Sequence, residues 1–307
     1  MGFDVYAYGM VSRSTLYKLN GKFPGPDGYC EFAEALPMIG GEAANSSIVL
    51  SRLGVSVRLD GNWLGTVNRG EEPLALLRAR GIDASRLLLV PGHRGVEEVV
   101  FAGEDARTIF GTYQKLFAGG PQWNAPRPED VREATVVSLD AFFREESLAV
   151  ARLAREHRKP YVTIDCKYDD EIAIHADVNV VSGEFRHNAY PEREIEELFT
   201  RYHERAEGLL VFTHGGGDVL FARKGGPVRR FPAYRIEPVD TAGAGDSFRA
   251  GMVYAVLRGW PDEVAVQFSA ALAAHVCGTF PGVLRCPTLE ELLAWTKAQG
   301  RPFAAPG

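Results

Sequence analysis

The sequence predicts a three-layer αβα domain with a mainly parallel central sheet and a small β lid. Strand-like apolar runs alternate with segments of helical spacing along most of the chain. Strands separated by helices of this length pair in parallel and leave helices on both faces of the sheet. Two stretches, residues 12–37 and 94–117, break this alternation. We expect residues 1–307 to form a single domain that carries these two stretches as lid insertions.

The expected strands are short apolar runs rich in β-branched residues. In chain order they are Val5–Val11, Val55–Leu59, Thr135–Leu139, Tyr161–Ile164, Val178–Val181, Leu209–Phe212 and Val228–Ile236. The expected helices have apolar residues three and four positions apart. They are Ala43–Leu53, Pro73–Arg80, Glu145–Glu156, Glu192–Arg205, Phe248–Arg258 and Asp262–Cys277, with a final helix announced by a capping box of Thr288 and Glu291.

Both insertions consist of short β-like pieces separated by turn residues. Residues 94–117 predict a hairpin that turns at Gly103–Asp105, and residues 12–37 contain the turn sequence Pro24-Gly25-Pro26. The simplest arrangement is one small sheet built from both insertions. An insertion of this kind commonly covers a functional site.

Composition and charge narrow the class of partner. The formal net charge is −6 and the isoelectric point is near 5.7, which argues against nucleic acid because phosphate backbones attract basic patches. No run reaches the ~20 apolar residues of a membrane-spanning helix, and the N-terminal segment lacks the pattern of a signal peptide. The cysteines Cys30, Cys166, Cys277 and Cys286 have no zinc-binding spacing. We expect a cytoplasmic protein that acts on a small molecule.

Residues 240–246, D-T-A-G-A-G-D, suggest a catalytic turn. They precede the helix expected at Phe248–Arg258, where the first backbone amides have no helical partner and attract anions. Small residues let a phosphate approach those amides, and Asp246 could take a proton from a hydroxyl that attacks it. Asp246 could instead only complement the helix dipole or pair with Arg249. Dinucleotide-binding and P-loop motifs fit this stretch less well.

A second glycine pair carries a family resemblance. Residues 40–54, G-G-E-A-A-N-S-S-I-V-L-S-R-L-G, and the stretch D-T-A-G-A-G-D-S-F-R-A-G-M-V resemble the two signatures of the ribokinase-like (PfkB) carbohydrate kinases, in the same order. The resemblance implies an ATP-dependent kinase that phosphorylates a hydroxymethyl group with ATP and Mg²⁺. In that family Asp246 corresponds to the catalytic base. The amides of Ala242, Gly243, Ala244 and Gly245 correspond to the anion hole.

The same resemblance implies further site residues. The substrate-binding positions are Ser14, Gly40, Gly41, Asn45 and Asp246. The ATP-binding positions are Thr213, Gly215, Gly243, Gly245, Ala274, His275 and Gly282. Glu184 falls at the position tied to magnesium, and Asp240 falls where some members hold K⁺, although Asp240 could equally cap a helix. The lid of the family often mediates homodimers.

Several positions depart from the family pattern. Ser14 replaces an Asp that usually binds sugar hydroxyls, and residues 65–70 lose two acidic positions. Gly183 and Arg186 replace both named residues of the N-x-x-E motif, and Asp165 begins an altered D-x-N-x-R pattern. Most of these positions lie on the sugar or metal side of the family's site. The resemblance therefore leaves the substrate open.

The lid itself offers competing interpretations. Arg13, Arg94 and Arg107 could face an anionic substrate, although exposed ion pairs are the commoner role of such residues. Aromatic lid residues could instead stack on a base and make the protein a nucleoside kinase; the candidates are Tyr17, Phe23, Tyr29 and Phe110. A third reading is a sugar- or nucleotide-sensing protein without turnover, which the loss of Asp at position 14 favours and the intact 240–246 turn opposes.

Overall fold

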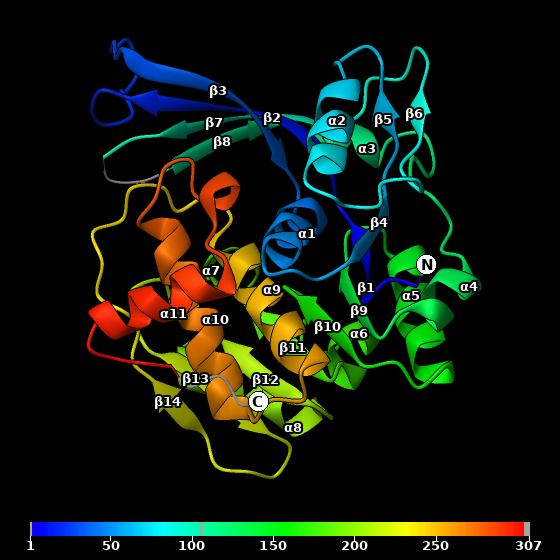
Figure 1. Cartoon of the computed structure of the whole chain (residues 1–307), viewed down its shortest axis with the longest axis vertical. Coiled ribbons are helices and arrows are strands. Elements are labelled where there is room, and N and C mark those ends of the chain that lie inside the picture. The colour runs from blue at the N-terminus through cyan, green and yellow to red at the C-terminus, as the bar shows by residue number, and fades with distance from the viewer. Residues whose placement is uncertain (1, 105–106, 304–307) are drawn as a thin grey trace.

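The computed structural model describes residues 2–104 and 107–303, and in them the central sheet has eight strands (Figure 1). Their order is β14-β13-β12-β11-β10-β9-β1-β4. The bounds are β1 Val5–Gly9, β4 Val57–Gly61, β9 Val136–Asp140, β10 Tyr161–Ile164, β11 Val178–Val181, β12 Leu209–Phe212, β13 Val219–Arg223 and β14 Arg229–Phe231.

The sheet is parallel from β4 to β12, and only β13 and β14 are antiparallel to their neighbours. Every residue of β1, β9, β10, β11 and β12 is buried. Strands buried on both faces read as continuous apolar runs, which explains why the sequence located them well. The prediction of a mainly parallel α/β sheet is confirmed.

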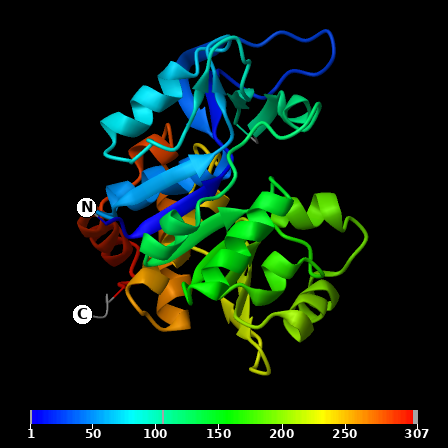
Figure 2. The same cartoon turned by 90° about the vertical axis from the view of Figure 1, so that its right-hand side faces the viewer.

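Helices cover both faces of the sheet, as the two views show (Figures 1 and 2). Val5 and Ala7 belong to a core shared with α1, α9 and α10, whereas Tyr6 and Tyr8 point to the opposite face and pack in the core of α5. The first layer contains α1 Glu42–Arg52, α9 Ala244–Leu257, α10 Asp262–Cys277 and α11 Leu289–Ala298; the second contains α4 Pro128–Glu133, α5 Glu145–Glu156, α6 Glu171–His175 and α8 Ile195–Arg205. In the described residues, no helix combines the length and the apolar character that crossing a membrane requires.

A four-stranded sheet stands above the carboxyl end of the main sheet and forms the lid (Figure 1). Its order is β3-β2-β7-β8, with bounds β2 Ser12–Leu19, β3 Phe32–Gly40, β7 Glu97–Ala102 and β8 Arg107–Gly111. Each insertion thus contributes two strands to one sheet, and β2 pairs with β7 in parallel. Gly103 and Glu104 lie between β7 and β8, while the predicted turn residue Asp105 lies outside the described residues.

The short segment between β1 and β2 joins the main sheet to the lid. The Met10 amide donates to Oδ2 of Asp140 at 2.8 Å. Asn62 accepts from the Val11 amide at 2.8 Å and donates to the Val11 carbonyl at 2.9 Å. Gly41 has φ +92°, and a Cβ there would collide with the Met10 carbonyl. Asp140, Asn62 and the close approach of Gly41 therefore hold this junction in place.

The largest departure from prediction lies before the turn of residues 240–246. Val228–Ile236 was expected as one strand, but only Arg229–Phe231 pairs, because Pro232 has no amide to donate to the ladder. The 240–246 turn accordingly follows an irregular loop and not a strand.

Other elements were missed or shifted. The sequence missed β13 and also α7 Gly183–Ala189, whose cap Ser182 accepts from the Phe185 amide at 3.0 Å. The helix expected from Glu192 begins at Ile195. The remaining elements are β5 Leu64–Gly65, α2 Glu71–Ala79, β6 Leu89–Val90, α3 Tyr113–Leu116 and the 3₁₀ turn η1 Val283–Arg285.

Candidate active site

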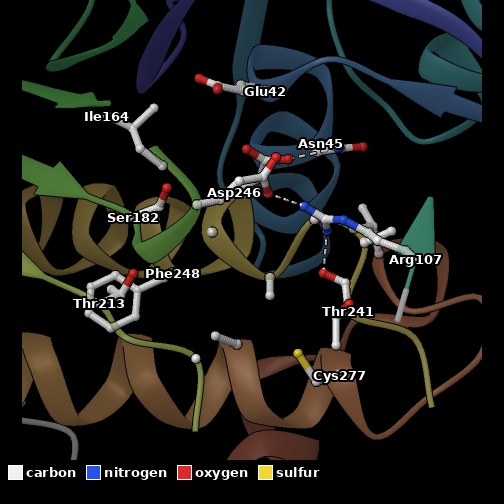
Figure 3. Close-up of a pocket in the computed structure, with 18 of the residues that line it drawn as sticks. Glu42, Asn45, Arg107, Ile164, Ser182, Thr213, Thr241, Asp246, Phe248 and Cys277 are labelled. Atoms are coloured by element: carbon white, nitrogen blue, oxygen red, sulfur yellow. Dashed lines mark hydrogen bonds and ion pairs between the residues drawn. The ribbon is translucent and has the colours of Figure 1, made fainter. Parts of the chain in front are cut away.

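The carboxyl ends of the parallel strands and the inner face of the lid enclose a cavity of about 1370 Å³ (Figure 3). Met10 follows β1, Asp165 follows β10 and Thr213 follows β12, and all three line this cavity. Open α/β sheets bind their ligands at this edge. A single small-molecule site usually measures ~300–1,000 Å³, so this cavity has room for two molecules side by side.

Asp246 lies in the first turn of α9, at the floor of the cavity. The residue is 8% exposed, and its Oδ2 accepts a hydrogen bond of 2.8 Å from Nδ2 of Asn45 (Figure 3). Burial raises the pKa of Asp246 above its usual value, while Arg249 and Asn45 oppose this effect. The geometry gives a carboxylate that is oriented by α1 and open to the cavity.

The turn before α9 has the backbone of an anion site. Gly243 caps the helix in the left-handed region with φ +74°. The Ala242 amide donates to Asp240 at 2.9 Å and the Ala244 amide to the Thr241 carbonyl at 3.4 Å, whereas the amides of Gly243 and Gly245 have no partner within the described chain. Amides of this kind at a helix N-terminus bind phosphate oxygens.

Gly243→Ala is expected to lower kcat by about tenfold or more, because it would move the amides that are predicted to form the anion hole. A Cβ at Gly243 would collide with Cγ2 of Val283, and φ +74° strains any other residue. Gly259→Ala is the matched control, since Gly259 follows the same helix with φ +66° and has open space around it. Steady-state kinetics of the two variants should separate them; equal kcat losses would contradict a role for the turn.

Four carboxylates interact electrostatically with one buried arginine, Arg249. Arg249 is 0% exposed and donates to Ser46 Oγ at 2.9 Å and to the Leu139 carbonyl at 3.3 Å. Its Nη1 lies 3.8 Å from Oε2 of Glu42. Burial raises the pKa of Asp140 and of Asp165 to about 6, and Arg249 opposes the rise in both. The pKa values of Glu42 and Asp246 are raised by burial as well.

The predicted substrate-binding residues come together at one end of the cavity. Ser14, Gly40, Gly41 and Asn45 all line it, together with Asp246. Gly40 and Gly41 join β3 to α1, and Asn45 projects from the first turns of α1 toward Asp246 (Figure 3). The two signatures, about 200 residues apart in the chain, therefore meet through this hydrogen bond and through the bond from Arg249 to Ser46.

The predicted nucleotide-binding residues are split between two places. Thr213, Gly215 and Ala274 line the main cavity beside the turn of residues 242–245. His275 does not line it and faces a second cavity of about 550 Å³. There its ring lies 5.7 Å from that of Trp295. Gly282 is buried, and its amide donates to Oδ2 of Asp240 at 3.1 Å.

The two predicted ion-binding residues have protein partners. Asp240 is buried, and its two oxygens accept from the amides of Ala242 and Gly282, which fixes the turn. Glu184 is 66% exposed at the edge of the cavity, and its Oε2 lies 2.8 Å from Nη2 of Arg107. Arg107 also donates to the Thr241 carbonyl at 2.5 Å, so this lid residue reaches across the cavity mouth (Figure 3). No cluster of three or more potential metal ligands occurs in residues 2–104 and 107–303.

The family of this chain follows from its match to a family model. Residues 38–289 match the model of the pfkB family of carbohydrate kinases, a span that includes both glycine signatures. The chain belongs to this family. It is therefore an ATP-dependent sugar or nucleoside kinase.

Individual relatives agree with this membership. The chain is 27% identical over 284 residues to a nucleoside kinase of Methanothermobacter thermautotrophicus, covering 89% of each protein. It is similar, with a TM-score of 0.86, to the crystal structure of an Agrobacterium tumefaciens protein thought to be a ribokinase (24% identity, 97% and 98% of the two chains). A ribokinase of Arabidopsis thaliana complexed with ribose and ATP has a TM-score of 0.78 at 16% identity, over 97% and 99% of the two chains.

The lid arginines of this pfkB kinase are held by acidic neighbours. Arg13 bonds to Glu72 and to Glu97 at 3.0 Å, and Arg94 lies 3.8 Å from Glu97. Neither arginine lines the main cavity. An anionic substrate therefore meets neither of them, and the salt-bridging interpretation holds for both.

The lid aromatics lie on its outer face. Tyr17, Phe23 and Phe110 contact Phe101 in one ring cluster. Neither these residues nor Tyr29 line the cavity, so a base bound within this lining would not stack on them. The inner face is aliphatic instead, with Leu16, Met38, Val100 and Ile109 lining the cavity.

Two acidic residues of the cavity wall, Glu42 and Glu98, were missed from the sequence alone. Asp165, which accepts from Ser182, was named only for its altered motif and not as a site residue. Glu42 stands directly after the Gly40-Gly41 pair, and Asp165 directly after a predicted strand, so both positions carried a usable signal. Glu98 could be found from strand alternation, since it shares a face with Val100.

Proposed function

We propose that the protein transfers the γ-phosphate of ATP to the hydroxymethyl group of a sugar or of a sugar-bearing small molecule. Asp246 is the catalytic base and the turn 242–245 is the anion hole. The observation that carries the proposal is the hydrogen bond from Asn45 to Asp246 beside the free amides of Gly243 and Gly245. In support of it, Asp246, the glycines Gly243 and Gly245 and the pair Gly40-Gly41 all line one cavity.

In the proposed reaction the acceptor hydroxyl lies against Asp246. Asp246 takes the hydroxyl proton as the oxygen forms a bond to the γ-phosphorus and the bond to the β-phosphate oxygen breaks, which releases ADP. The amides of Gly243 and Gly245 stabilise the charge on the transferring group. We call the end of the cavity that is lined by Ser14, Gly40, Gly41 and Asn45 the acceptor end. The lid lies over this end and excludes water, which would otherwise compete as acceptor.

Mg²⁺ would neutralise charge on the β- and γ-phosphates when bound. Glu184 is the carboxylate we propose for it, because an exposed carboxylate at the cavity edge suits a hard cation. Its contact with Arg107 would have to open first. For Asp240 we propose the role of holding the turn, which the amides of Ala242 and Gly282 support by donating to its two oxygens. One further lone pair on each oxygen would be open to K⁺.

The acceptor can be a free sugar or a nucleoside. The Arabidopsis ribokinase has ribose and ATP bound, and the Methanothermobacter relative is a nucleoside kinase. The aliphatic inner face of the lid could also cover a base. The test is ADP release with Mg-ATP across sugars, polyols, sugar acids and nucleosides. Turnover of at least one neutral member is expected; tight binding without any turnover would overturn the proposal.

The rate should depend on pH through Asp246. A base acts when ionised, so kcat falls as the pH drops through the pKa of Asp246, which burial places above its usual value. The hydrogen bond from Asn45 lowers this pKa. Asn45→Ala should therefore move the acid limb of the kcat profile to higher pH. An unmoved limb would mean that another group controls it.

We further propose a cytoplasmic homodimer that associates through the outer face of the lid. Its exposed aromatic residues, Phe23, Phe32 and Phe110, provide an apolar surface of the kind that interfaces bury. The four cysteines are unpaired, as expected in a reducing compartment. Light scattering at micromolar concentration tests the dimer, and a monomer would refute it.

A further inference from the structure

One buried carboxylate of the lid has no role in the reaction as proposed. Glu98 on β7 is 7% exposed and lines the acceptor end of the main cavity. Its neighbours on the inner face of the lid sheet are apolar, namely Val100 on the same strand and Leu16 on β2. An acidic side chain on such a surface costs stability unless its oxygens are hydrogen-bonded.

The surroundings of Glu98 orient its carboxylate so that it can accept hydrogen bonds. Oε2 accepts from the Tyr113 hydroxyl. Oε1 faces Gly40, where any Cβ would collide with it. Burial raises the pKa of Glu98, while the hydroxyls of Tyr113 and Ser14 oppose this rise. The carboxylate is thus oriented beside the same glycine pair that shapes the acceptor end.

The strand register connects Glu98 to the altered position 14. In the parallel pair β2–β7, Ser14 lies directly opposite Glu98. Directly paired residues in neighbouring strands present their side chains to the same face of a sheet. A carboxylate on Glu98 therefore serves the same part of the cavity that a carboxylate at position 14 would serve.

Charge at the cavity wall indicates what this end accepts. Five carboxylates line the main cavity within the described residues: Glu42, Glu98, Asp165, Glu184 and Asp246. The arginines among the same lining residues are Arg107, which is held by Glu184 and Thr241, and Arg235, on the exposed loop before α9. No arginine or lysine therefore stands beside Glu98 in this lining.

We propose that Glu98 binds hydroxyl groups of the acceptor and restricts it to molecules without negative charge at that end. The inference rests on the proposed function. It selects free sugars, polyols and nucleosides and rejects sugar acids and sugar phosphates. Hydroxyls donate to a carboxylate, whereas a second carboxylate or a phosphate is repelled by it.

The first test compares Glu98→Gln with Glu97→Gln. Loss of a hydrogen bond to a charged group should raise the acceptor KM by about 10- to 100-fold, with kcat and the KM for ATP nearly unchanged. Glu97 is the adjacent residue, outside the lining of the cavity, where it pairs with Arg13. Its variant should keep the wild-type acceptor KM. Equal acceptor KM values for wild type and a folded Glu98→Gln would overturn the inference.

A carboxylate swap separates binding from folding. Ser14→Asp combined with Glu98→Ser moves the acid across the same register pair. The double variant should recover acceptor affinity relative to Glu98→Ser alone, which a purely structural role of Glu98 would not produce. No recovery, with both variants folded by melting temperature, would count against the inference.

The last test measures the selectivity of the wild type between neutral and acidic acceptors. Ribose against ribonate and glucose against gluconate differ in the charge of the acceptor. The neutral member of a pair should react or bind at least tenfold better, and a preference for the acid overturns the inference. If no acceptor turns over, calorimetry separates the inference from the proposed function. Neutral acceptors that bind to the wild type and lose affinity in Glu98→Gln would support this inference while the proposed function fails. The absence of any acceptor binding would contradict both.

Discussion

Asp246→Asn is expected to lower kcat by about 10²- to 10⁴-fold, the range that general-base catalysis contributes. Asn has nearly the same shape and can still bond to Asn45, but it cannot take the proton of the acceptor. The affinity for ATP and the melting temperature should stay close to those of the wild type, because burial already disfavours the charged form of Asp246. ADP-release kinetics, calorimetry with ATP and thermal unfolding measure the three quantities.

Asp262→Asn is the matched control for this variant. Asp262 occupies the first turn of the neighbouring helix α10, so it has the same relation to a helix dipole. It pairs with Arg223 at 2.8 Å and lies outside the main cavity. A role in the dipole alone would make the two variants alike. If Asp246→Asn keeps a kcat near that of Asp262→Asn, the base has been misassigned.

Arg249→Met is expected to lower the free energy of unfolding by about 3–5 kcal/mol, because it leaves buried carboxylates without their cation. The loss should be larger at pH 8 than at pH 5. Asp140 and Asp165 have pKa values raised to about 6 in the folded protein, so the folded form holds their protons more tightly than the unfolded chain. The stability linked to that protonation is present at low pH and disappears as the pH rises through about 6.

Urea unfolding of the variant and the wild type at the two pH values tests this expectation. Arg152→Met is a suitable control, since Arg152 forms an exposed ion pair with Glu171 on the outer helices α5 and α6. Its removal should change stability little at either pH. A cost for Arg249→Met that does not vary with pH would show that lost packing, and not the carboxylates, sets its size.

The sequence predicted the site best where one element determines a residue's place. Asp246 and Gly243 belong to one helix start, and Asn45 lies one turn after the Gly40-Gly41 pair, so their local geometry followed from the motifs alone. His275 shows the opposite case. It is next to Ala274 along α10, yet one residue turns a helix by about 100°, which carries His275 to another face and another cavity.

Residues that depend on contacts between distant segments could not be placed from the sequence. Arg249 was considered only as a partner of Asp246 three residues along the helix, but the packing of α9 against α1 buries it beside Glu42 and Ser46. Glu98 faces Ser14 only because β7 pairs with β2 in one register out of several. A sheet register formed between segments more than 80 residues apart leaves no local pattern in the sequence.

The fixed junction at Met10–Val11 has a mechanical consequence. Strand β2 leaves the main sheet there, and β3 returns at Gly40-Gly41, where the backbone passes against Met10. We expect the lid to open by rotating about this crossing. The residues at the pivot are those that line the acceptor end, so the grip on the acceptor and the angle of the lid should change together. A lid deleted to expose the cavity would leave no acceptor site behind.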